Sequence, residues 1–307
     1  MTVKRRKTRL VKIGGVKVGA GAPVAIQSMA KLETSDVNAV VAQIKRLEGC
    51  GCEIIRVAVK RAADAKAIGD IKKHINIPLV ADIHFDYRLA LESIDAGADK
   101  IRLNPGNMKN RDEVALVVRA AKKAGIPIRI GVNSGSTSGD FVRAALKYIR
   151  VFEDLSFRDI IISLKGSSVP ETVDAYRKMS KACSYPLHLG ETASGPYESG
   201  IVKSAIGIGA LLLDGIGDTI RVSLTAEPEE EVLAAKRILS SLGLRKFGHQ
   251  IISCPTCGRC QVSLVKIVNE LEDALRTTNY ERRTTQPSLT IAVMGCEVND
   301  GCVVRRS

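Results

Sequence analysis

The chain has 307 residues, of which 45% are hydrophobic, and a formal net charge of +13. This length and composition suffice for a large buried core, enough for one barrel-sized domain and a small appendage. The N-terminus contains no apolar signal-peptide region, and the most apolar stretch, residues 205–217, is shorter than a bilayer span and contains Asp214. We therefore expect a cytoplasmic protein without a membrane partner.

The basic segment KRRKTR lies near the N-terminus, at residues 4–9. A net positive charge is typical of proteins that bind nucleic acid, anionic membranes or phosphorylated small molecules. For this segment we expect a solvated surface strand rather than a nucleic-acid-binding arm.

Eight short, apolar and β-branched segments alternate with longer amphipathic stretches. Apolar residues in those stretches recur every three or four positions, as in helices, and several of the stretches end at glycine. This alternation predicts an α/β fold, a (β/α)₈ TIM barrel, because eight βα units close a parallel barrel. A doubly wound open sheet is the alternative, but no GxGxxG loop follows the first segment. The predicted strands are residues 24–29, 53–59, 78–85, 100–106, 128–134, 159–166, 186–192 and 218–225.

The pattern changes after the eighth helical stretch. A basic link at residues 245–250 is followed by IISCPTCGRC, one helical stretch, a polar connector and a final apolar segment. We predict a barrel domain over residues 1–247 and a small α+β domain over residues 248–307 that carries most of the cysteines.

Arginine occurs inside four of the predicted strands, at Arg56, Arg102, Arg129 and Arg221. Lys165 ends the sixth strand, and Lys203 follows the seventh. Active sites of such barrels lie at the C-terminal strand ends, and cations that converge there repel one another unless an anion neutralises them. The alternative is that these side chains point outward between helices. The recurrence on four strands favours a site for phosphate oxygens, which planar guanidinium groups bind well.

Polar residues at the strand ends support this interpretation. Asn104 and Asn133 end two strands and are suited to orienting substrate oxygens, while Asp82 and His84 lie together in ADIHFD. His84 is a candidate proton donor, and a hydrogen-bonded core histidine is its alternative. His188 stays unassigned.

The cysteines of the C-terminal segment show metal-ligand spacing. Cys254 and Cys257 form a CxxC pair, and Cys296 follows in MGC. A zinc ribbon would need a second CxxC pair, whereas three cysteines suit a [4Fe–4S] cluster with one iron left for another ligand. Cys260 is either a fourth ligand or a bystander.

With these motifs in place, the chain resembles the family of 4-hydroxy-3-methylbut-2-enyl diphosphate synthases. The resemblance is carried by IQSM, CEIIRVAV, PLVADIHFDYRLAL, KIRLNPGN, RIGVNSGS, SLKGS, ISCPTCGRC and VMGC, from about residue 22 to residue 296. It implies that Cys254, Cys257 and Cys296 hold a [4Fe–4S] cluster, and that His84 is a weaker match to a catalytic position. The implied substrate-binding positions are Arg56, Arg102, Asn104, Arg129, Asn133, Lys165 and Lys203.

The resemblance also implies a reaction and partners. The reaction is the two-electron reductive ring opening and dehydration of 2-C-methyl-D-erythritol 2,4-cyclodiphosphate, with flavodoxin or ferredoxin as electron donor. It further implies a homodimer in which the cluster domain of one subunit closes over the barrel of the other.

The chain departs from the family near its C-terminus. The family continues GCVVNGPGE after the third cysteine, and the glutamate is the fourth iron ligand; here GCEVNDGCVVRRS places Val303 at that position, with Cys302 beside it. Ala193 also replaces a glutamate that is frequent in the family. The alternative to an active enzyme is therefore a catalytically impaired remnant that binds the cyclic diphosphate and has a labile cluster, its C-terminal domain incomplete.

Overall fold

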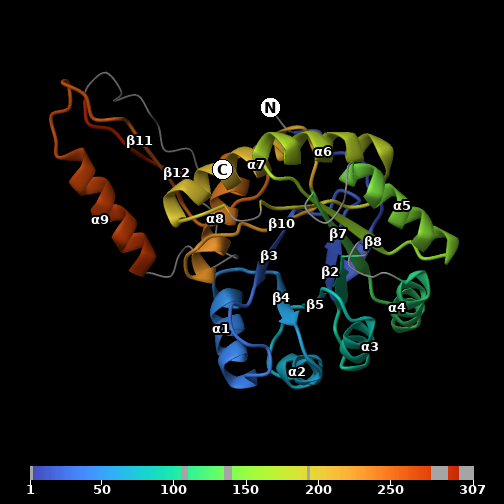
Figure 1. Cartoon of the computed structure of the whole chain (residues 1–307). Helices are drawn as coiled ribbons and strands as arrows, with labels where there is room; N and C mark the ends of the chain where they lie inside the picture. The colour runs from blue at the N-terminus through green and yellow to red at the C-terminus, as the bar shows by residue number, and fades with distance from the viewer. Residues whose placement is uncertain (1–2, 105–109, 135–139, 192–193, 278–289, 297–307) are drawn as a thin grey trace. The chain divides into compact units, whose positions relative to one another are not determined.

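The structure, a computed structural model, describes residues 3–104, 110–134, 140–191, 194–277 and 290–296. It divides into two compact units, Met1–Arg245 and Lys246–Ser307, drawn from blue to red in Figure 1. In the described part of the chain, no helix is both long enough and apolar enough to cross a bilayer.

The first unit is a closed parallel barrel, so the predicted fold class is confirmed. The hydrogen-bonded strand order is β8-β7-β6-β5-β4-β3-β10-β9, and a parallel bridge from Ile162 to Leu187 joins β8 to the segment that enters β9. Because the first and last strands of the order meet, the doubly wound open sheet is excluded. The strands are β3 (Ala25–Met29), β4 (Ile54–Val59), β5 (Leu79–Ile83), β6 (Lys100–Leu103), β7 (Ile128–Asn133), β8 (Ile160–Lys165), β9 (His188–Leu189) and β10 (Thr219–Ile220).

Within the described residues of this unit, eight helices surround the barrel, one after each strand. Side chains of Asp36, Asp86, Asn110, Asp140 and Ser168 accept hydrogen bonds from first-turn backbone N–H groups and so fix where five of them begin. The helices are α1 (Val37–Gly49), α2 (Ala62–Lys72), α3 (Tyr87–Asp95), α4 (Arg111–Ala124), α5 (Phe141–Asp154), α6 (Val169–Ala182), α7 (Tyr197–Leu213) and α8 (Pro228–Ser241).

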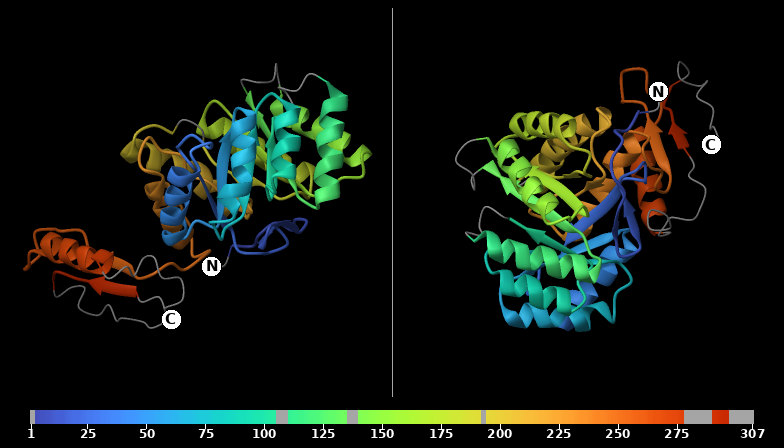
Figure 2. Two further views of the ribbon diagram at one scale, coloured as in Figure 1. Left: turned by 90° about the horizontal axis from the view of Figure 1, so that it is seen from below. Right: turned by 90° about the vertical axis from the view of Figure 1, so that its right-hand side faces the viewer.

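A short antiparallel hairpin closes the end of the barrel at which the strands begin. It consists of β1 (Val11–Ile13) and β2 (Val16–Val18), joined by a two-glycine turn in which Gly14 has a φ of +52°. Its buried side chains pack with residues at the starts of four barrel strands: Ala25, Ile54, Val80 and Ile161. Figure 2 shows the hairpin in dark blue at one end of the barrel.

The basic N-terminal segment differs from the expected solvated strand. Lys4, Lys7 and Arg9 are exposed. Arg5, however, donates to the carbonyl oxygen of Gly217 at 3.0 Å and to Asp218 at 3.1 Å, and Arg6 donates to backbone carbonyls near the end of α6. These two arginines attach the segment to the barrel, because guanidinium groups satisfy carbonyls left open at a helix C-terminus.

The second unit has a β-α-β arrangement. Strand β11 (Gln250–Ser253) pairs in parallel with β12 (Thr290–Val293), and α9 (Leu264–Thr277) lies between them in the chain. The predicted small domain with a helix between two strands is therefore present.

Candidate active site

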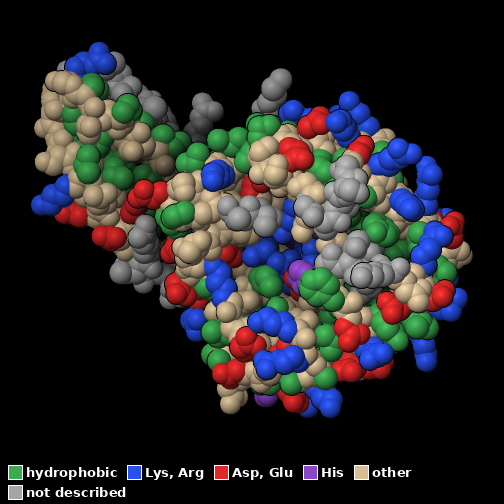
Figure 3. Space-filling view, viewed as in Figure 1, with side chains coloured by type: hydrophobic (Ala, Val, Ile, Leu, Met, Phe, Trp, Pro, Cys, Tyr) green, Lys and Arg blue, Asp and Glu red, His purple; other side chains and the backbone are tan. Residues whose placement is uncertain are grey.

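Five cationic side chains converge at the C-terminal end of the barrel, and we refer to them as the mouth cluster. Strand register places Arg102 beside Asp82 on one side and Arg129 on the other. Residues paired across neighbouring strands point to the same face of the sheet, and these three are buried inside the barrel. Figure 3 shows Lys and Arg side chains gathered in a hollow near the centre of the face drawn, with a histidine beside them. The mouth cluster comprises Arg56, Arg102, Arg129, Lys165 and Arg221.

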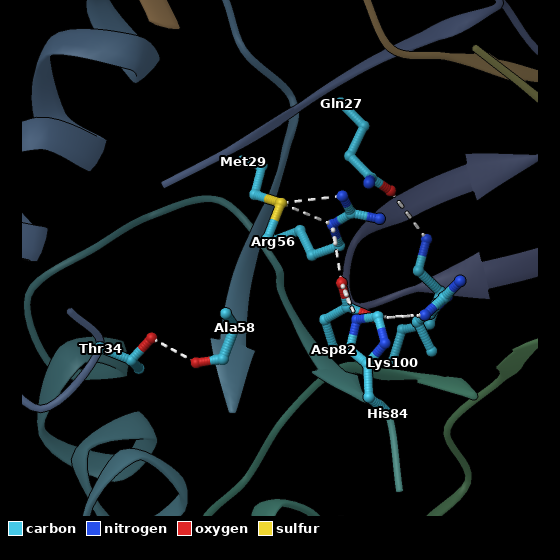
Figure 4. Close-up of polar contacts among 9 residues, drawn as sticks. Gln27, Met29, Thr34, Arg56, Ala58, Asp82, His84 and Lys100 are labelled. Atoms are coloured by element: carbon cyan, nitrogen blue, oxygen red, sulfur yellow. Dashed lines mark hydrogen bonds and ion pairs between the residues drawn. The ribbon is translucent and has the colours of Figure 1, made fainter. Parts of the chain in front are cut away.

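Asp82 is the carboxylate around which the cluster is organised. Its Oδ2 lies 3.5 Å from Nε of Arg56 (Figure 4). Its Oδ1 lies 3.2 Å from Nη1 of Arg102. Burial alone would raise the pKa of Asp82, but Arg56, His84 and Arg102 outweigh it and hold the pKa well below the usual range. Asp82 therefore stays ionised and offsets one of the five positive charges.

Arg129 carries unsatisfied hydrogen-bonding capacity. It is 1% exposed, and within the described part of the chain its Nε and Nη1 have no hydrogen-bond partner. Burial and the nearby Arg102 lower its pKa to about 9, and burial and Arg56 likewise lower the pKa of Lys165. Buried donors of this kind are costly unless a partner meets them. A bound polyanion would supply the missing acceptors and relieve the repulsion.

Neighbouring residues position the guanidinium groups. A Cβ at Gly131 of β7 would lie 2.7 Å from Nε of Arg102, so the glycine gives that side chain room to lie across the strand. Arg56 donates to the thioether sulfur of Met29 from Nη2 at 2.8 Å (Figure 4). These contacts hold both groups against the barrel wall.

A second polar layer lies one pleat deeper in the barrel. Lys100 is fully buried and donates to Oε1 of Gln27 at 3.1 Å, and burial together with Arg129 lowers its pKa well below the usual value. His188 Nδ1 lies 2.8 Å from Oγ1 of Thr219. Burial and Arg129 also lower the pKa of His188, so the ring stays neutral where it lines the cavity beside Arg56 and Lys165. Sequence reasoning passed over Lys100, although its two-residue spacing from Arg102 was a usable signal.

Glu191 is a further buried carboxyl that sequence reasoning missed. It follows β9, and burial raises its pKa to about 7 despite the opposing effect of Lys165. A Cβ at Gly207 would collide with its Oε1, so α7 has a gap that admits the carboxyl group. Because this contact depends on how α7 packs on the barrel, no local sequence pattern could indicate it.

The structure places the remaining predicted residues at different depths. Asn104 is buried at the end of β6, and Asn133 is half-buried at the end of β7. His84 is exposed at the mouth, with Nε2 3.6 Å from Oδ2 of Asp82 and 3.4 Å from Nη1 of Arg102. Lys203 is exposed on α7, and among the described residues its side chain makes no hydrogen bond or ion pair with the mouth cluster. Ala193 lies outside the described residues.

The cysteines gather at one edge of the second unit. Cys254 follows β11 and Cys296 follows β12, and the two strands are parallel, so both cysteines lie at the carboxyl edge of the pair. The 257–260 turn returns to this edge, because Gln261 N donates to the carbonyl of Gly295 at 2.9 Å. A Cβ at Gly295 would lie 2.6 Å from Sγ of Cys260.

This donor set suits iron–sulfur chemistry by composition and placement. Thiolates are the usual ligands of such clusters, and three of them follow two adjacent strands here. Among the described residues, no three His, Cys, Asp or Glu side chains are already arranged around a common point. The geometry therefore brings the cysteines to one edge without closing a ligand set.

The fold and these two sites define a class: a TIM barrel with buried cationic side chains at its mouth, followed by a cysteine-bearing α+β domain. The GcpE TIM-barrel domain matches residues 8–236, and the GcpE protein C-terminal domain matches residues 250–302. The chain belongs to the GcpE family.

Curated relatives agree with this assignment. A protein of Caldanaerobacter subterraneus is 53% identical over 97% of this chain and 86% of its own length, and one of Bacillus pumilus is 52% identical over 96% and 81%. Both are named 4-hydroxy-3-methylbut-2-en-1-yl diphosphate synthase (flavodoxin). Among solved structures, Yersinia pestis dihydropteroate synthase is similar over 76% of this chain and 98% of its own, with a TM-score of 0.58 at 13% identity. That likeness shows the fold alone.

The C-terminal departure from the family, at Cys302 and Val303, lies outside the described residues. The comparisons favour the active enzyme, since the relatives that match nearly the whole chain carry the name of the enzyme, and nothing in them supports the impaired remnant.

Proposed function

We propose that this chain is an iron–sulfur oxidoreductase that converts 2-C-methyl-D-erythritol 2,4-cyclodiphosphate into 4-hydroxy-3-methylbut-2-enyl diphosphate in the cytoplasm. The observation that carries the substrate class is the mouth cluster, in which two buried donors of Arg129 have no partner among the described residues. The relatives' name supports the product and flavodoxin as electron donor, with ferredoxin as a second possible donor.

The mouth cluster is suited to a diphosphate. Guanidinium forks bind phosphate oxygens in pairs, and Arg56, Arg102 and Arg129 present such forks from β4, β6 and β7. Lys165 adds a compact charge at the end of β8, and the amides of Asn104 and Asn133 lie at the rim, where they can orient hydroxyl oxygens. For Lys203, which is exposed on α7, a substrate contact stays a prediction from the resemblance.

The cluster would be a [4Fe–4S] group held by Cys254, Cys257 and Cys296. When bound, it supplies electrons one at a time to the substrate. Cys260 is the fourth thiol at this edge, and its Sγ donates to the carbonyl of Val262 at 3.2 Å. That hydrogen bond favours a structural role for Cys260 in the turn over a role as a cluster ligand.

The overall reaction consumes two electrons and two protons. One C–O bond to the cyclic diphosphate opens, one hydroxyl leaves as water, and a carbon–carbon double bond remains in the product. We assign proton delivery to His84, because it lies at the mouth against ionised Asp82 and Arg102. Asp82 would orient the ring, and the arginines would stabilise the departing diphosphate oxygen.

The functional unit is proposed to be a homodimer in which each cysteine domain serves the partner's barrel. Arg245, the last residue of the barrel unit, lies 2.5 Å from Oε2 of Glu53 and 3.0 Å from the carbonyl of Val24. Both residues precede their barrel strands, so the chain leaves the barrel at the end opposite the mouth. This exit supports delivery of the cluster to a neighbouring subunit.

The test is anaerobic turnover of the reconstituted chain with reduced flavodoxin, followed by mass spectrometry of the product. Two inactive variants, Arg129→Gln and Cys254→Ser, are then mixed. Because each retains what the other lacks, every mixed dimer should contain one intact pair of sites. About half of the dimers are mixed after exchange, so the mixture should recover up to about a quarter of the wild-type rate. Absence of product from the wild-type chain would overturn the proposed reaction, and product without recovery on mixing would overturn only the exchange of domains.

A further inference from the structure

Among the described residues, β8 and β9 are joined by an isolated bridge rather than by a continuous ladder. The bridge lies at Ile162 and Leu187, and Ile162 N donates to the carbonyl oxygen of Pro186 at 3.0 Å. On its other side, β8 pairs with β7 along all six of its residues. If the ladder continued from the bridge towards the mouth, its next rung would run from Leu164 N to the carbonyl oxygen of His188.

The hydroxyl group of Tyr176 occupies this rung. It accepts a hydrogen bond from Leu164 N at 3.0 Å and donates one to the carbonyl oxygen of His188. Tyr176 lies on α6 and is fully buried, and burial raises the pKa of its hydroxyl, which therefore keeps its proton. A hydroxyl satisfies both backbone groups because it is donor and acceptor at once. The two strands are thereby held further apart than a direct rung would hold them.

A small cavity lies between the strands beyond this rung. Ser163 and Lys165 of β8 line one side of it, and Gly190, which follows β9, lines the other. Arg56 and Arg221 of the mouth cluster reach the same cavity, and so does the tyrosine ring. Three of the five mouth cations therefore share a space whose width is set by the inserted hydroxyl.

Lys165 is the mouth residue that the rung controls most directly. It follows Leu164, so a movement of the Leu164 backbone is passed on to it. Without the hydroxyl, Leu164 N and the carbonyl oxygen of His188 would be buried without a partner, and the strands would have to move together to satisfy them. Such a movement would shift Lys165 and narrow the cavity that it shares with the two arginines.

We infer that Tyr176 is a positioning residue for the substrate, whose hydroxyl keeps one rung of the barrel open and so sets the place of Lys165 at the mouth. The inference rests on the proposed function for the identity of the substrate. The contact itself would serve any diphosphate, because it fixes the cation and not the organic part of the ligand. Tyr176 acts through the backbone of β8, and no contact with the reacting atoms is assigned to it.

The test is calorimetric titration of the full chain with inorganic pyrophosphate and with the cyclic diphosphate. Tyr176→Phe keeps the ring and removes only the hydroxyl, and it is expected to raise both dissociation constants roughly tenfold at a temperature at which circular dichroism shows it folded. Tyr185→Phe is the matched control, since Tyr185 is also buried and donates to Oε1 of Glu153 at 2.7 Å, where the chain enters β9. It is expected to lower the unfolding temperature and leave both dissociation constants unchanged.

Action through Lys165 is tested by a double-mutant cycle. Lys165→Met removes the charge and is expected to weaken pyrophosphate binding by itself. Adding Tyr176→Phe to it is expected to weaken binding by less than about twofold further, because the side chain that the hydroxyl positions is already gone. A further loss as large as in the wild-type background would overturn the inference, since the hydroxyl would then act independently of Lys165.

A fluorine label gives a second measurement that does not depend on the stability of Tyr176→Phe. With 3-fluorotyrosine in place of Tyr176, the fluorine resonance is expected to shift on addition of pyrophosphate, and the same label in place of Tyr185 is not. An unshifted resonance, or unchanged affinity in folded Tyr176→Phe, would overturn the inference and leave the proposed reaction standing. Roughly tenfold weaker pyrophosphate binding in Tyr176→Phe, together with no product from the wild-type chain, would overturn the reaction and leave the inference standing.

Discussion

Individual residues of the mouth cluster were predictable where a charged residue lies within an otherwise apolar strand segment. Arg56, Arg102 and Arg129 were selected on that basis, and all three are buried and face the same interior. Strand alternation makes such a prediction possible, because the orientation of one inward residue fixes that of residues two positions away. Glu191 was not predictable, since its burial depends on the gap at Gly207, which lies on a different element.

Glu191 should make the stability of the barrel depend on pH. Burial raises its pKa from 4.5 to about 7, so its neutral form stabilises the fold fully below about pH 4.5, and that contribution is lost as the pH rises through about 7. Glu191→Gln keeps the neutral form at every pH. We expect the variant to match the wild type at pH 4.5 and to be more stable at pH 8, on the order of 1 kcal/mol.

Thermal unfolding from pH 4.5 to 8 measures this effect. Glu198→Gln, at an exposed residue in the first turn of α7, is the matched control and should show no such divergence. If the unfolding temperatures of Glu191→Gln and the wild type changed with pH in the same way, the fold would not be holding the carboxyl group neutral.

At the scale of elements, the eight βα units were predictable and the β1–β2 hairpin was not. Each strand of the hairpin has only three residues, too few to show a periodicity, and its Gly-Gly turn lies in a segment that reads as a basic N-terminus. Its role becomes clear from packing, since Val11, Ile13 and Val18 join the starts of the barrel strands in one core.

The hairpin should therefore stabilise the barrel without taking part in binding. Ile13 is fully buried, and Ile13→Ala is expected to cost on the order of 2–4 kcal/mol in the free energy of unfolding. Leu10→Ala, at a neighbouring residue that is 47% exposed, should change it by less than about 0.5 kcal/mol. Urea unfolding and calorimetric titration distinguish the two effects. A loss of anion affinity in folded Ile13→Ala would contradict the separation of stability from binding.

At the scale of the whole molecule, two units with different chemistry were predictable from where the charges and cysteines lie along the chain. The sequence motifs placed the arginines on the barrel and Cys254, Cys257 and Cys296 on the second unit. Spacing alone left Cys260 open, because CxxCxxC permits two or three ligands. The fold adds that Cys260 packs against Gly295 and donates to a backbone carbonyl.

Ligand assignment yields a prediction for the second unit. Cys254→Ser, Cys257→Ser and Cys296→Ser should each lose the cluster after anaerobic reconstitution, because three thiolates are the minimum that can hold it. Cys260→Ser should retain most of its iron. Iron analysis and the visible absorption spectrum provide the measurement, with Cys183→Ser in the barrel unit as the control. Equal loss of iron in Cys260→Ser would make Cys260 a ligand.

The most direct test of the account is calorimetric titration of the chain with 2-C-methyl-D-erythritol 2,4-cyclodiphosphate. The account predicts binding that weakens as salt concentration rises, and a loss on the order of 2–4 kcal/mol in Arg129→Gln. That substitution removes the charge and the donors that have no partner in the described part of the chain. Arg119→Gln, the same substitution on the exposed side of α4, should bind as the wild type does. Equal affinity in Arg129→Gln and the wild type would contradict the assignment of the mouth cluster as the substrate site.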